Sequence, residues 1–498
     1  MKYISYITAF FFVALTLASC KKDKPTESGT PIIDFSYEPV EPTAGEVVSF
    51  MAEIKPGSSN IVSWEWSFGT SDHSSIKDPL FTFANEGSFD VRLTATDAAG
   101  ETATVTKTIE VLAAPVTEFP ATLAWTFENN TPVSAKNDAT APAIGDDGVI
   151  YYVEGFAGIN SKMVAVSDQG TAATVKWNET YGGDLRNAPA IGPDGHIYIG
   201  KWTVNAITKI NSTTGAMQWE QATAGAGMSN STTAIDANGN IYFASRVTAS
   251  LGGIFSFAGN GTKRWEIETP DFGATYSSPA ISKDGGTVYF FASTAGQAVA
   301  INTADGSFKW TTPLEVGSNG VGPSLSINSD GTIYVTTAEE VVAITDEGTS
   351  GAIKWKAPAV GANSSGVVIG PNSDLYVGSK DGLKSINAAS GSVNWTYEAF
   401  MEECVPAVDQ GGNVYFGDVS GKLYIVNEDG ELQKALSLGQ SENAVVHTPT
   451  IGDDGSVYVE VSDDGKVKLC KIAVENSGPA DSPWPMKGQN RKHTGRAK

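Results

Sequence analysis

The stretch Ala188–Gly200, "APAIGPDGHIYIG", decides the fold because closely similar stretches return along the whole second part of the chain. In this copy two apolar runs, "PAI" and "HIYIG", flank a "GPDG" sequence. Glycine adopts the positive φ that tight turns need, and aspartate accepts hydrogen bonds from its own backbone there. The stretch therefore predicts a hairpin of two short β-strands.

A tyrosine follows the turn in each copy, and successive tyrosines lie 39 to 47 residues apart. The tyrosines are Tyr151, Tyr198, Tyr242, Tyr289, Tyr334, Tyr376, Tyr415 and Tyr458. A third apolar run and then a tryptophan-containing run complete most units. A period in the forties with four strand signals per unit predicts the blades of a β-propeller. The Asp-Gly turns lack the regular oxygen spacing of calcium loops, so no metal site is predicted.

One large ring per unit is expected to pack between neighbouring blades, with ligand stacking as the alternative role. These tryptophans are Trp125, Trp177, Trp219, Trp265, Trp310, Trp355 and Trp395. Trp125 precedes the first tyrosine, whereas the last unit ends after its third strand. We therefore expect "TLAWTF" (Thr122–Phe127) to supply the outer strand of an eighth blade and to close the ring. In the unit after Tyr415, Leu432 is expected in the tryptophan position.

The first residues have the features of an export signal. Lys2 precedes an apolar run, Ile7–Leu17, that is too short to span a bilayer, and "LASC" ends at Cys20. This arrangement resembles a bacterial lipobox, which implies a signal peptide over residues 1–19 and lipidation of Cys20. A plain secretory signal with an incidental cysteine is the alternative. Residues 20–31 are polar and contain Pro and Gly, which favours a flexible tether.

Residues 32–113 predict a small sandwich domain. Period-two alternation in Ser88–Ala95 places Phe89, Val91, Leu93 and Ala95 on one face. Short strands separated by Gly, Pro and Asp turns over this length fit an immunoglobulin-like sandwich. The segment also resembles the PKD domain family, through a tryptophan strand that ends in Phe68-Gly69 and a later aromatic strand. In that family such domains mostly serve as spacers and adhesive modules.

After a linker over residues 114–120, the array over residues 121–476 resembles the PQQ-like propeller family in units such as "INAASGSVNWTYE" (Ile386–Glu398). That family includes quinoprotein dehydrogenases and a non-enzymatic lipoprotein of outer-membrane barrel assembly. The tail over residues 477–498, with "SPWPMKGQNRKHTGR", resembles the tail of many secreted propellers of this type. The expected fold class is thus all-β, an immunoglobulin-like PKD sandwich followed by an eight-bladed β-propeller.

Composition and reactive residues narrow the function. The net charge of −23 argues against nucleic acid as a partner. Quinoprotein dehydrogenases, as a family, have an adjacent cysteine pair, whereas Cys404 and Cys470 lie far apart. These two are expected to be buried free thiols, with a disulfide between them as the alternative. The four histidines do not cluster, and no GxSxG sequence is present. These absences favour a protein without enzymatic activity and without a cofactor; a quinone-dependent (PQQ) oxidoreductase stays open as the alternative.

Binding is therefore the expected activity, through the loops that precede the first strand of each unit. Departures from the repeat mark candidate ligand-binding residues at the channel mouth, against the alternative that they are only solvated loop residues. The candidates are Asp184, Arg186, Asn230, Tyr276, Asn363, Glu402, Glu403 and His447. We expect a lipoprotein of a Gram-negative outer membrane, on its surface or periplasmic face, that binds a protein or glycan and meets the membrane only through its lipid. A scaffold for outer-membrane assembly is a further alternative.

Overall fold

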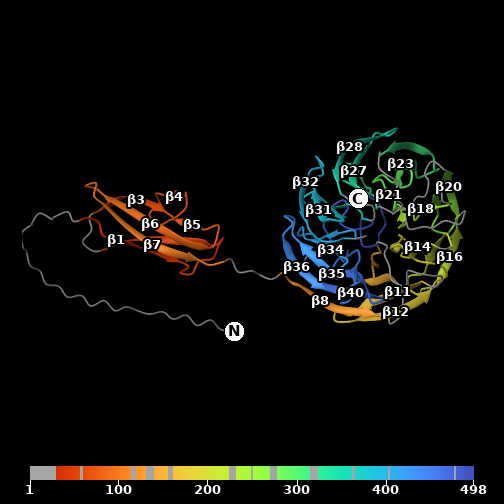
Figure 1. Cartoon of the computed structure of the whole chain (residues 1–498), viewed down its shortest axis with the longest axis horizontal. Coiled ribbons are helices and arrows are strands. Elements are labelled where there is room, and N and C mark those ends of the chain that lie inside the picture. Colours follow the sequence, from red (N-terminus) through yellow and green to blue (C-terminus); the bar gives the residue numbers. More distant parts are fainter. Residues whose placement is uncertain are drawn as a thin grey trace, which may run out of the picture. The chain divides into compact units, whose positions relative to one another are not determined.

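The computed structural model describes residues 30–55, 60–113, 119–129, 140–154, 161–202, 204–223, 232–247, 251–269, 277–314, 324–359, 361, 365–401, 404–475 and 478–498. The chain divides into two compact units, Met1–Thr117 and Glu118–Lys498. Strands β1 to β40 are the regular elements of the described residues, among which no α-helix occurs (Figure 1). The all-β prediction is confirmed for this part of the chain.

Unit 1 contains two antiparallel sheets that enclose one core. The first sheet has the order β1 (Ile33–Glu38), β2 (Val47–Ile54), β5 (Leu80–Thr82). The second has the order β4 (His73–Ser74), β3 (Ile61–Ser67), β6 (Gly87–Asp97), β7 (Thr102–Val111). Trp66 is fully buried between them, with its ring 5.1 Å from that of Phe35 and 5.4 Å from that of Phe50. Val91, Leu93 and Ala95 of β6 are buried as the alternation predicts, and Phe89 packs against the same core.

Unit 2 consists of repeated sheets arranged around a central axis, as Figure 1 shows. Sheets 1 to 4 contain, in order, β9 (Ala143–Ile144), β10 (Val149–Glu154), β11 (Lys162–Asp168), β12 (Ala173–Thr180); β13 (Ala190–Ile191), β14 (Ile197–Lys201), β15 (Ala206–Ile210), β16 (Met217–Ala222); β17 (Ala234–Ile235), β18 (Ile241–Arg246), β19 (Gly252–Phe257), β20 (Lys263–Thr269); and β21 (Ala280–Ile281), β22 (Thr287–Ala292), β23 (Gln297–Asn302), β24 (Phe308–Pro313).

Sheets 5 to 8 continue the series. They contain β25 (Ser326–Ile327), β26 (Ile333–Thr336), β27 (Glu340–Asp346), β28 (Gly351–Pro358); β29 (Val368–Ile369), β30 (Leu375–Ser379), β31 (Gly382–Ile386), β32 (Val393–Tyr397); β33 (Ala407–Val408), β34 (Val414–Gly417), β35 (Lys422–Val426), β36 (Leu432–Ser437); and β37 (Val445–Val446), β38 (Thr450–Ile451), β39 (Val457–Asp463), β40 (Lys466–Val474), β8 (Ala121–Glu128). Sheets of this kind are consistent with a propeller.

The quoted stretch forms the predicted hairpin in sheet 2. Ala190 of β13 pairs with Tyr198 of β14. Gly195 has φ of +75° and donates its N–H to the carbonyl of Gly192, while Asp194 Oδ1 accepts the N–H of His196. The first two strands of each sheet, which form this hairpin, are its inner strands. We call the end of the inner strands that carries the hairpin turn the turn end. We call the opposite end, at which the chain enters from the previous sheet, the loop end.

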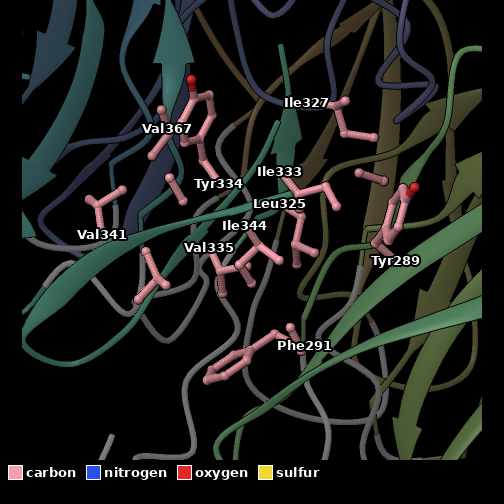
Figure 2. Packing of buried hydrophobic residues seen from close by; sticks show 14 of the residues in the cluster. Tyr289, Phe291, Leu325, Ile327, Ile333, Tyr334, Val335, Val341, Ile344 and Val367 are labelled. Atoms are coloured by element: carbon pink, nitrogen blue, oxygen red, sulfur yellow. The ribbon is translucent and has the colours of Figure 1, made fainter. Parts of the chain in front are cut away.

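Buried apolar residues join neighbouring sheets into shared clusters. Figure 2 shows one cluster in which Tyr289 and Phe291 of sheet 4 pack with residues of sheets 5 and 6. Leu325 and Ile333 of sheet 5 and Val367 of sheet 6 belong to the same cluster. No single sheet could bury both of its faces alone, so each depends on its neighbours for its core.

The repeated tryptophans lie where consecutive sheets meet. Each ring lies 5.8 to 6.1 Å from the repeat tyrosine of its own sheet. Each Nε1 donates a hydrogen bond of 2.7 to 3.2 Å to the turn between the third and fourth strands of the next sheet. The acceptor is a backbone carbonyl in five cases and the carboxylate of Asp168 or Asp346 in the other two.

Sheet 7 has no tryptophan at this position. The prediction that Leu432 takes its place is wrong, because the equivalent residue lies two positions later in the chain. In sheet 6 Trp395 pairs with Ser385, and a bulge precedes the pair of Val393 with Ile386. The corresponding pairs in sheet 7 are Lys434 with Ile425 and Leu432 with Val426. Lys434 therefore occupies the tryptophan position, and Leu432 lies on the half-exposed face. The bulge adds an unpaired residue that the spacing of the sequence does not reveal.

Sheet 8 joins the first and last segments of unit 2. β8 pairs antiparallel with β40, with Trp125 opposite Lys471, and the Trp125 ring contacts Tyr458. The inner part of this sheet differs from the expected single strand, because β37 and β38 both pair with β39. Cys470 of β40 and Cys404 are both buried free thiols, as expected.

The C-terminal tail, which the sequence separates from the propeller, is part of the unit's interior. Backbone carbonyls of the tail accept the N–H groups of Ile144, Ile191, Ile235, Ile281, Ile369 and Val408, at 2.7 to 2.8 Å. These residues end the inner strands of six different sheets, so the tail crosses the turn end of the ring. Trp484, Met486 and His493 of the tail are buried. Figure 1 shows the C-terminus inside the circle of sheets.

Charge holds the tail at this end. Residues 477–498 carry Lys487, Arg491, Lys492, Arg496 and Lys498 against the single carboxylate of Asp481, in a chain of net charge −23. Arg491 lies 3.1 Å from Asp146 and 2.9 Å from Asp453, both in Asp-Gly turns, and also donates to the carbonyls of Ile144 and Gly145. Lys492 lies 2.5 Å from Asp146. The cationic tail thus binds the acidic turns of sheets 1 and 8.

A glycine substitution tests the packing between sheets. Gly391 has φ of +75°, and a Cβ there would lie 2.7 Å from the Trp355 ring, whereas a Cβ at Gly170, with φ of +85°, would meet no atom within 4 Å. Both Gly391→Ala and Gly170→Ala strain the backbone, but only the first also displaces an indole. We expect Gly391→Ala to lower the free energy of unfolding by roughly 1–3 kcal/mol more than Gly170→Ala, measured by urea denaturation. Equal losses would show that the indole contact adds nothing.

Arg491→Gln tests the tail. It removes two ion pairs and two hydrogen bonds to carbonyls, so we expect a loss of about 1–3 kcal/mol in the free energy of unfolding. Lys498→Gln is the matched control, because Lys498 makes one exposed pair of 3.4 Å with Asp481. Its loss should be about 0.5 kcal/mol or less. A control loss as large as that of Arg491→Gln would contradict a specific role for Arg491.

Candidate functional site

The structure describes three of the predicted channel-mouth residues. Asp184, Arg186 and His447 lie in the described part of the chain, near the loop end of the inner strands. The other candidates lie outside the described residues: Asn230, Tyr276, Asn363, Glu402 and Glu403. Cys20, the predicted lipidation site, also lies outside them. The described part of the predicted site thus consists of these first three residues and their neighbours.

Asp184 and Arg186 come together in the segment between β12 and β13. The Arg186 Nε donates to Asp184 Oδ2 at 2.7 Å, and the guanidinium lies 4.4 Å from the centre of the Trp202 ring. The Asp184 carbonyl accepts the N–H of Trp202 at 2.7 Å, which fixes the indole beside the arginine. The three residues thus form one unit that we call the Arg186–Trp202 stack.

Burial differs sharply within the stack. The Asp184 side chain is 1% exposed, whereas that of Arg186 is 27% exposed. Ser161 Oγ also donates to Asp184, at 3.4 Å. Burial raises the pKa of Asp184 although the hydrogen bond and charge of Arg186 act in the opposite direction. Asp184 therefore positions the guanidinium, and Arg186 is the more exposed member of the pair.

His447 is buried and does not belong to an open mouth. Its Nε2 lies 2.7 Å from Ser462 Oγ, and its N–H donates to the carbonyl of Glu460 at 2.9 Å. Its carbonyl lies 3.8 Å from the Cys404 sulfur. The alternative of a solvated loop residue is wrong for His447 and for Asp184, because tertiary packing covers both side chains.

Glu460 is the residue at this end that the sequence reasoning missed. It lies two residues after the repeat tyrosine of sheet 8, and its side chain is fully buried. The corresponding residues of the other sheets are Val153, Gly200, Ala244, Phe291, Thr336, Gly378 and Gly417. Glu460 is thus the one ionisable member of the set. Alignment of the repeats on their tyrosines, instead of on the preceding loops, would have revealed it.

The surroundings of Glu460 favour its neutral form. Thr140 Oγ1 lies 3.1 Å from Glu460 Oε2, while Oε1 has no hydrogen-bond partner among the described residues. Glu154, also buried, accepts the hydroxyl of Tyr152 at 2.7 Å on the adjacent sheet. Burial raises the pKa of Glu460 to about 8, and the negative charge of Glu154 acts in the same direction. The carboxyl group can therefore hold a proton near neutral pH.

The reactive groups of the described residues do not form a catalytic centre. Burial raises the pKa of Cys404 to about 12 and that of Cys470 to about 11, so neither thiol is an activated nucleophile. No group of three or more His, Cys, Asp and Glu side chains placed to hold a metal ion occurs in the described ranges. The described residues at this end offer a partly exposed arginine on an aromatic ring and a buried carboxyl group.

Known proteins match both units. A family described as outer membrane protein assembly factor BamB, a PQQ-repeat family, matches residues 161–397 and 317–478, which together exceed half of the chain. The chain belongs to this family. The PKD domain family matches residues 28–112. The protein is thus a PKD domain followed by a PQQ-type propeller of the BamB-like kind, although no curated protein matches it.

Two solved structures illustrate what the chain is similar to. BamB from Moraxella catarrhalis has a TM-score of 0.53 and 16% sequence identity, over 70% of this chain and 99% of that one. A streptogramin B lyase is similar with a TM-score of 0.42 and 18% identity, over 58% of this chain and 93% of that one. At such identities the BamB likeness shows the fold alone. None of the described segments is a helix of the length and apolarity needed to cross a membrane.

The pKa of Glu460 predicts a pH dependence of stability. The native carboxyl group keeps its proton up to about pH 8, whereas the unfolded one loses it near the ordinary glutamate pKa of 4.5. The contribution of this carboxyl group to the free energy of unfolding is therefore complete below its pKa in the unfolded state. That contribution is lost as pH rises through its pKa in the native state. Between pH 4.5 and 8 the free energy of unfolding of the wild type should fall by roughly a few kcal/mol relative to that of Glu460→Gln, measured by urea denaturation.

Glu266→Gln is the control for this experiment, because Glu266 is exposed on β20 and pairs with Lys263. It should follow the wild-type pH profile. A Glu460→Gln profile parallel to that of the wild type would contradict the raised pKa.

Proposed function

We propose that this protein is a non-enzymatic envelope lipoprotein whose propeller binds a protein or glycan partner at the cell surface or in the periplasm. Its eight sheets form eight blades, closed by the β8–β40 pair. The N-terminal segment that ends at Cys20 supplies the lipid anchor in the outer membrane. The PKD domain acts as the spacer between that anchor and the propeller.

The Arg186–Trp202 stack is the observation that carries the proposal. Arginine and tryptophan are the side chains most enriched among the residues that dominate binding energy at interfaces. Arginine stacks on aromatic rings, and its planar fork of N–H donors matches carboxylates and phosphates. The buried Asp184 holds the pair in place before a partner arrives, so little conformational entropy is lost on binding.

A second candidate is a scaffold for outer-membrane assembly. The family match supports it, because that family is described by an assembly factor. The partner would then be another envelope protein that is reached from the periplasm, not a ligand outside the cell. Location separates the scaffold from binding at the cell surface, whereas a periplasmic location fits both candidates: protease treatment of intact and of permeabilised cells shows on which side the propeller lies. Digestion in intact cells would support surface binding, and protection until permeabilisation would contradict it.

Arg186→Glu tests the binding surface itself. The purified chain should retain a glycan from an array, or a protein from a detergent extract of the envelope, and the variant should bind at least roughly tenfold more weakly. Lys263→Glu is the control, because Lys263 is half-exposed on the outer strand β20 of another sheet and its Glu266 pair is exposed. Equal binding by wild type and Arg186→Glu, or no retained partner, would contradict the proposal.

A further inference from the structure

A cavity of 510 Å³ lies at the turn end of the ring, between the tail and the Asp-Gly turns. Its volume falls within the range typical of small-molecule sites. Pro193 and Ile235 line one side, and Pro485 and Met486 of the tail line another. These walls are largely apolar and are held by the backbone hydrogen bonds between the tail and the inner strands. The tail residues of the lining are therefore fixed to the inner strands by their backbone.

Four cationic side chains of the tail also line the cavity, and three of them have counter-ions. Arg491 contacts Asp146 and Asp453, Lys492 contacts Asp146, and Lys498 lies 3.4 Å from Asp481. Arg496 is the fourth. Its half-buried side chain makes no hydrogen bond or ion pair with any residue that the structure describes. The cavity thus contains one guanidinium that forms no ion pair with a carboxylate of the described residues.

Three carboxylates line the cavity, and two of them, those of Asp453 and Asp481, contact Arg491 and Lys498. The third, that of Asp236, is already used by its own turn. Oδ1 accepts the N–H groups of Asn238 and Asn240, at 2.8 and 2.9 Å. Oδ2 accepts the side chain of Asn240 and the hydroxyl of Tyr242, at 2.8 and 3.0 Å. The Asp236 side chain is therefore fixed in the turn and has little capacity left for Arg496.

Polar groups beside Arg496 extend the potential contact surface. Asn490 and Thr494 line the same cavity, and the Asn490 amide lies 2.6 Å from Thr494 Oγ1. A partly buried, unpaired guanidinium is unfavourable without a counter-charge, and its planar fork matches the two oxygens of a carboxylate or phosphate. Apolar walls next to it suit the carbon frame of a small molecule.

We propose that this cavity binds a small organic anion, with Arg496 as the residue that pairs with its carboxylate or phosphate group. The anion supplies the counter-charge that the described residues do not, while the proline and aliphatic walls contact its frame. The site lies at the opposite end of the inner strands from the Arg186–Trp202 stack. It is therefore independent of the proposed partner surface, and each can fail without the other.

Three compounds that share the glucose ring test the proposal. Their binding to the purified full chain is measured by isothermal titration calorimetry at matched ionic strength. They are glucuronate, glucose 6-phosphate and glucose, which carry a carboxylate, a phosphate or neither. We expect one or both anions to bind on the order of tenfold or more tightly than glucose. A preference between the two anions identifies the acidic group. Anions that bind no better than glucose would overturn the proposal.

Variants locate the binding. Arg496→Gln should weaken binding of the preferred anion by roughly tenfold or more. Arg496→Lys, which keeps the charge but loses the planar guanidinium, should weaken it by less. Lys263→Gln, on the outer strand β20, should bind as the wild type does. Because the Arg496 side chain makes no hydrogen bond with the described residues, Arg496→Gln should keep the wild-type Tm. Unchanged affinity in a folded Arg496→Gln variant would overturn the assignment.

Discussion

The contact between the tryptophan of one sheet and the strand turn of the next is the interaction on which unit 2 depends. A sheet with three buried strands has no partner layer of its own, so it must bury its faces against its two neighbours. The indole does this at the periphery, by contact with the repeat tyrosine behind it and a hydrogen bond to the turn ahead of it. At Gly391 the turn requires glycine, because the Trp355 indole occupies the space that a Cβ would take.

An arrangement in which each sheet needs both neighbours is stable only when the first and last sheets also meet. β8 meets this requirement through its pairing with β40, which covers the edge of β40 that β39 leaves unpaired. The tail adds a second connection at the turn end, since its carbonyls accept N–H groups from the inner strands of six sheets. Its positive charges meet aspartates that the repeat places in the turns, so the repeat that forms the hairpins also provides the binding surface for the tail.

The two ends of the inner strands differ as a consequence. At the turn end the tail covers the channel and leaves a cavity with basic and apolar walls. At the loop end the described residues include a partly exposed arginine on an indole and buried polar groups such as Glu460 and His447. The proposed recognition surface and the proposed small-molecule site therefore lie at opposite ends of the inner strands.

The amino-acid sequence by itself determined the strand content, the repeat and the order of the two units, because Gly-Asp turns and alternating apolar residues are local signals. The period of the tyrosines and the position of Trp125 likewise indicated that β8 completes the last sheet. Only the tertiary structure decided which of the unusual residues face a ligand. Asp184 and His447 are polar by sequence but are covered by packing, while the bulge in each fourth strand moves the tryptophan position of sheet 7 from Leu432 to Lys434. The place of the tail was equally beyond the sequence, since its hydrogen bonds use backbone groups of strands up to 347 positions away and no side-chain pattern records them.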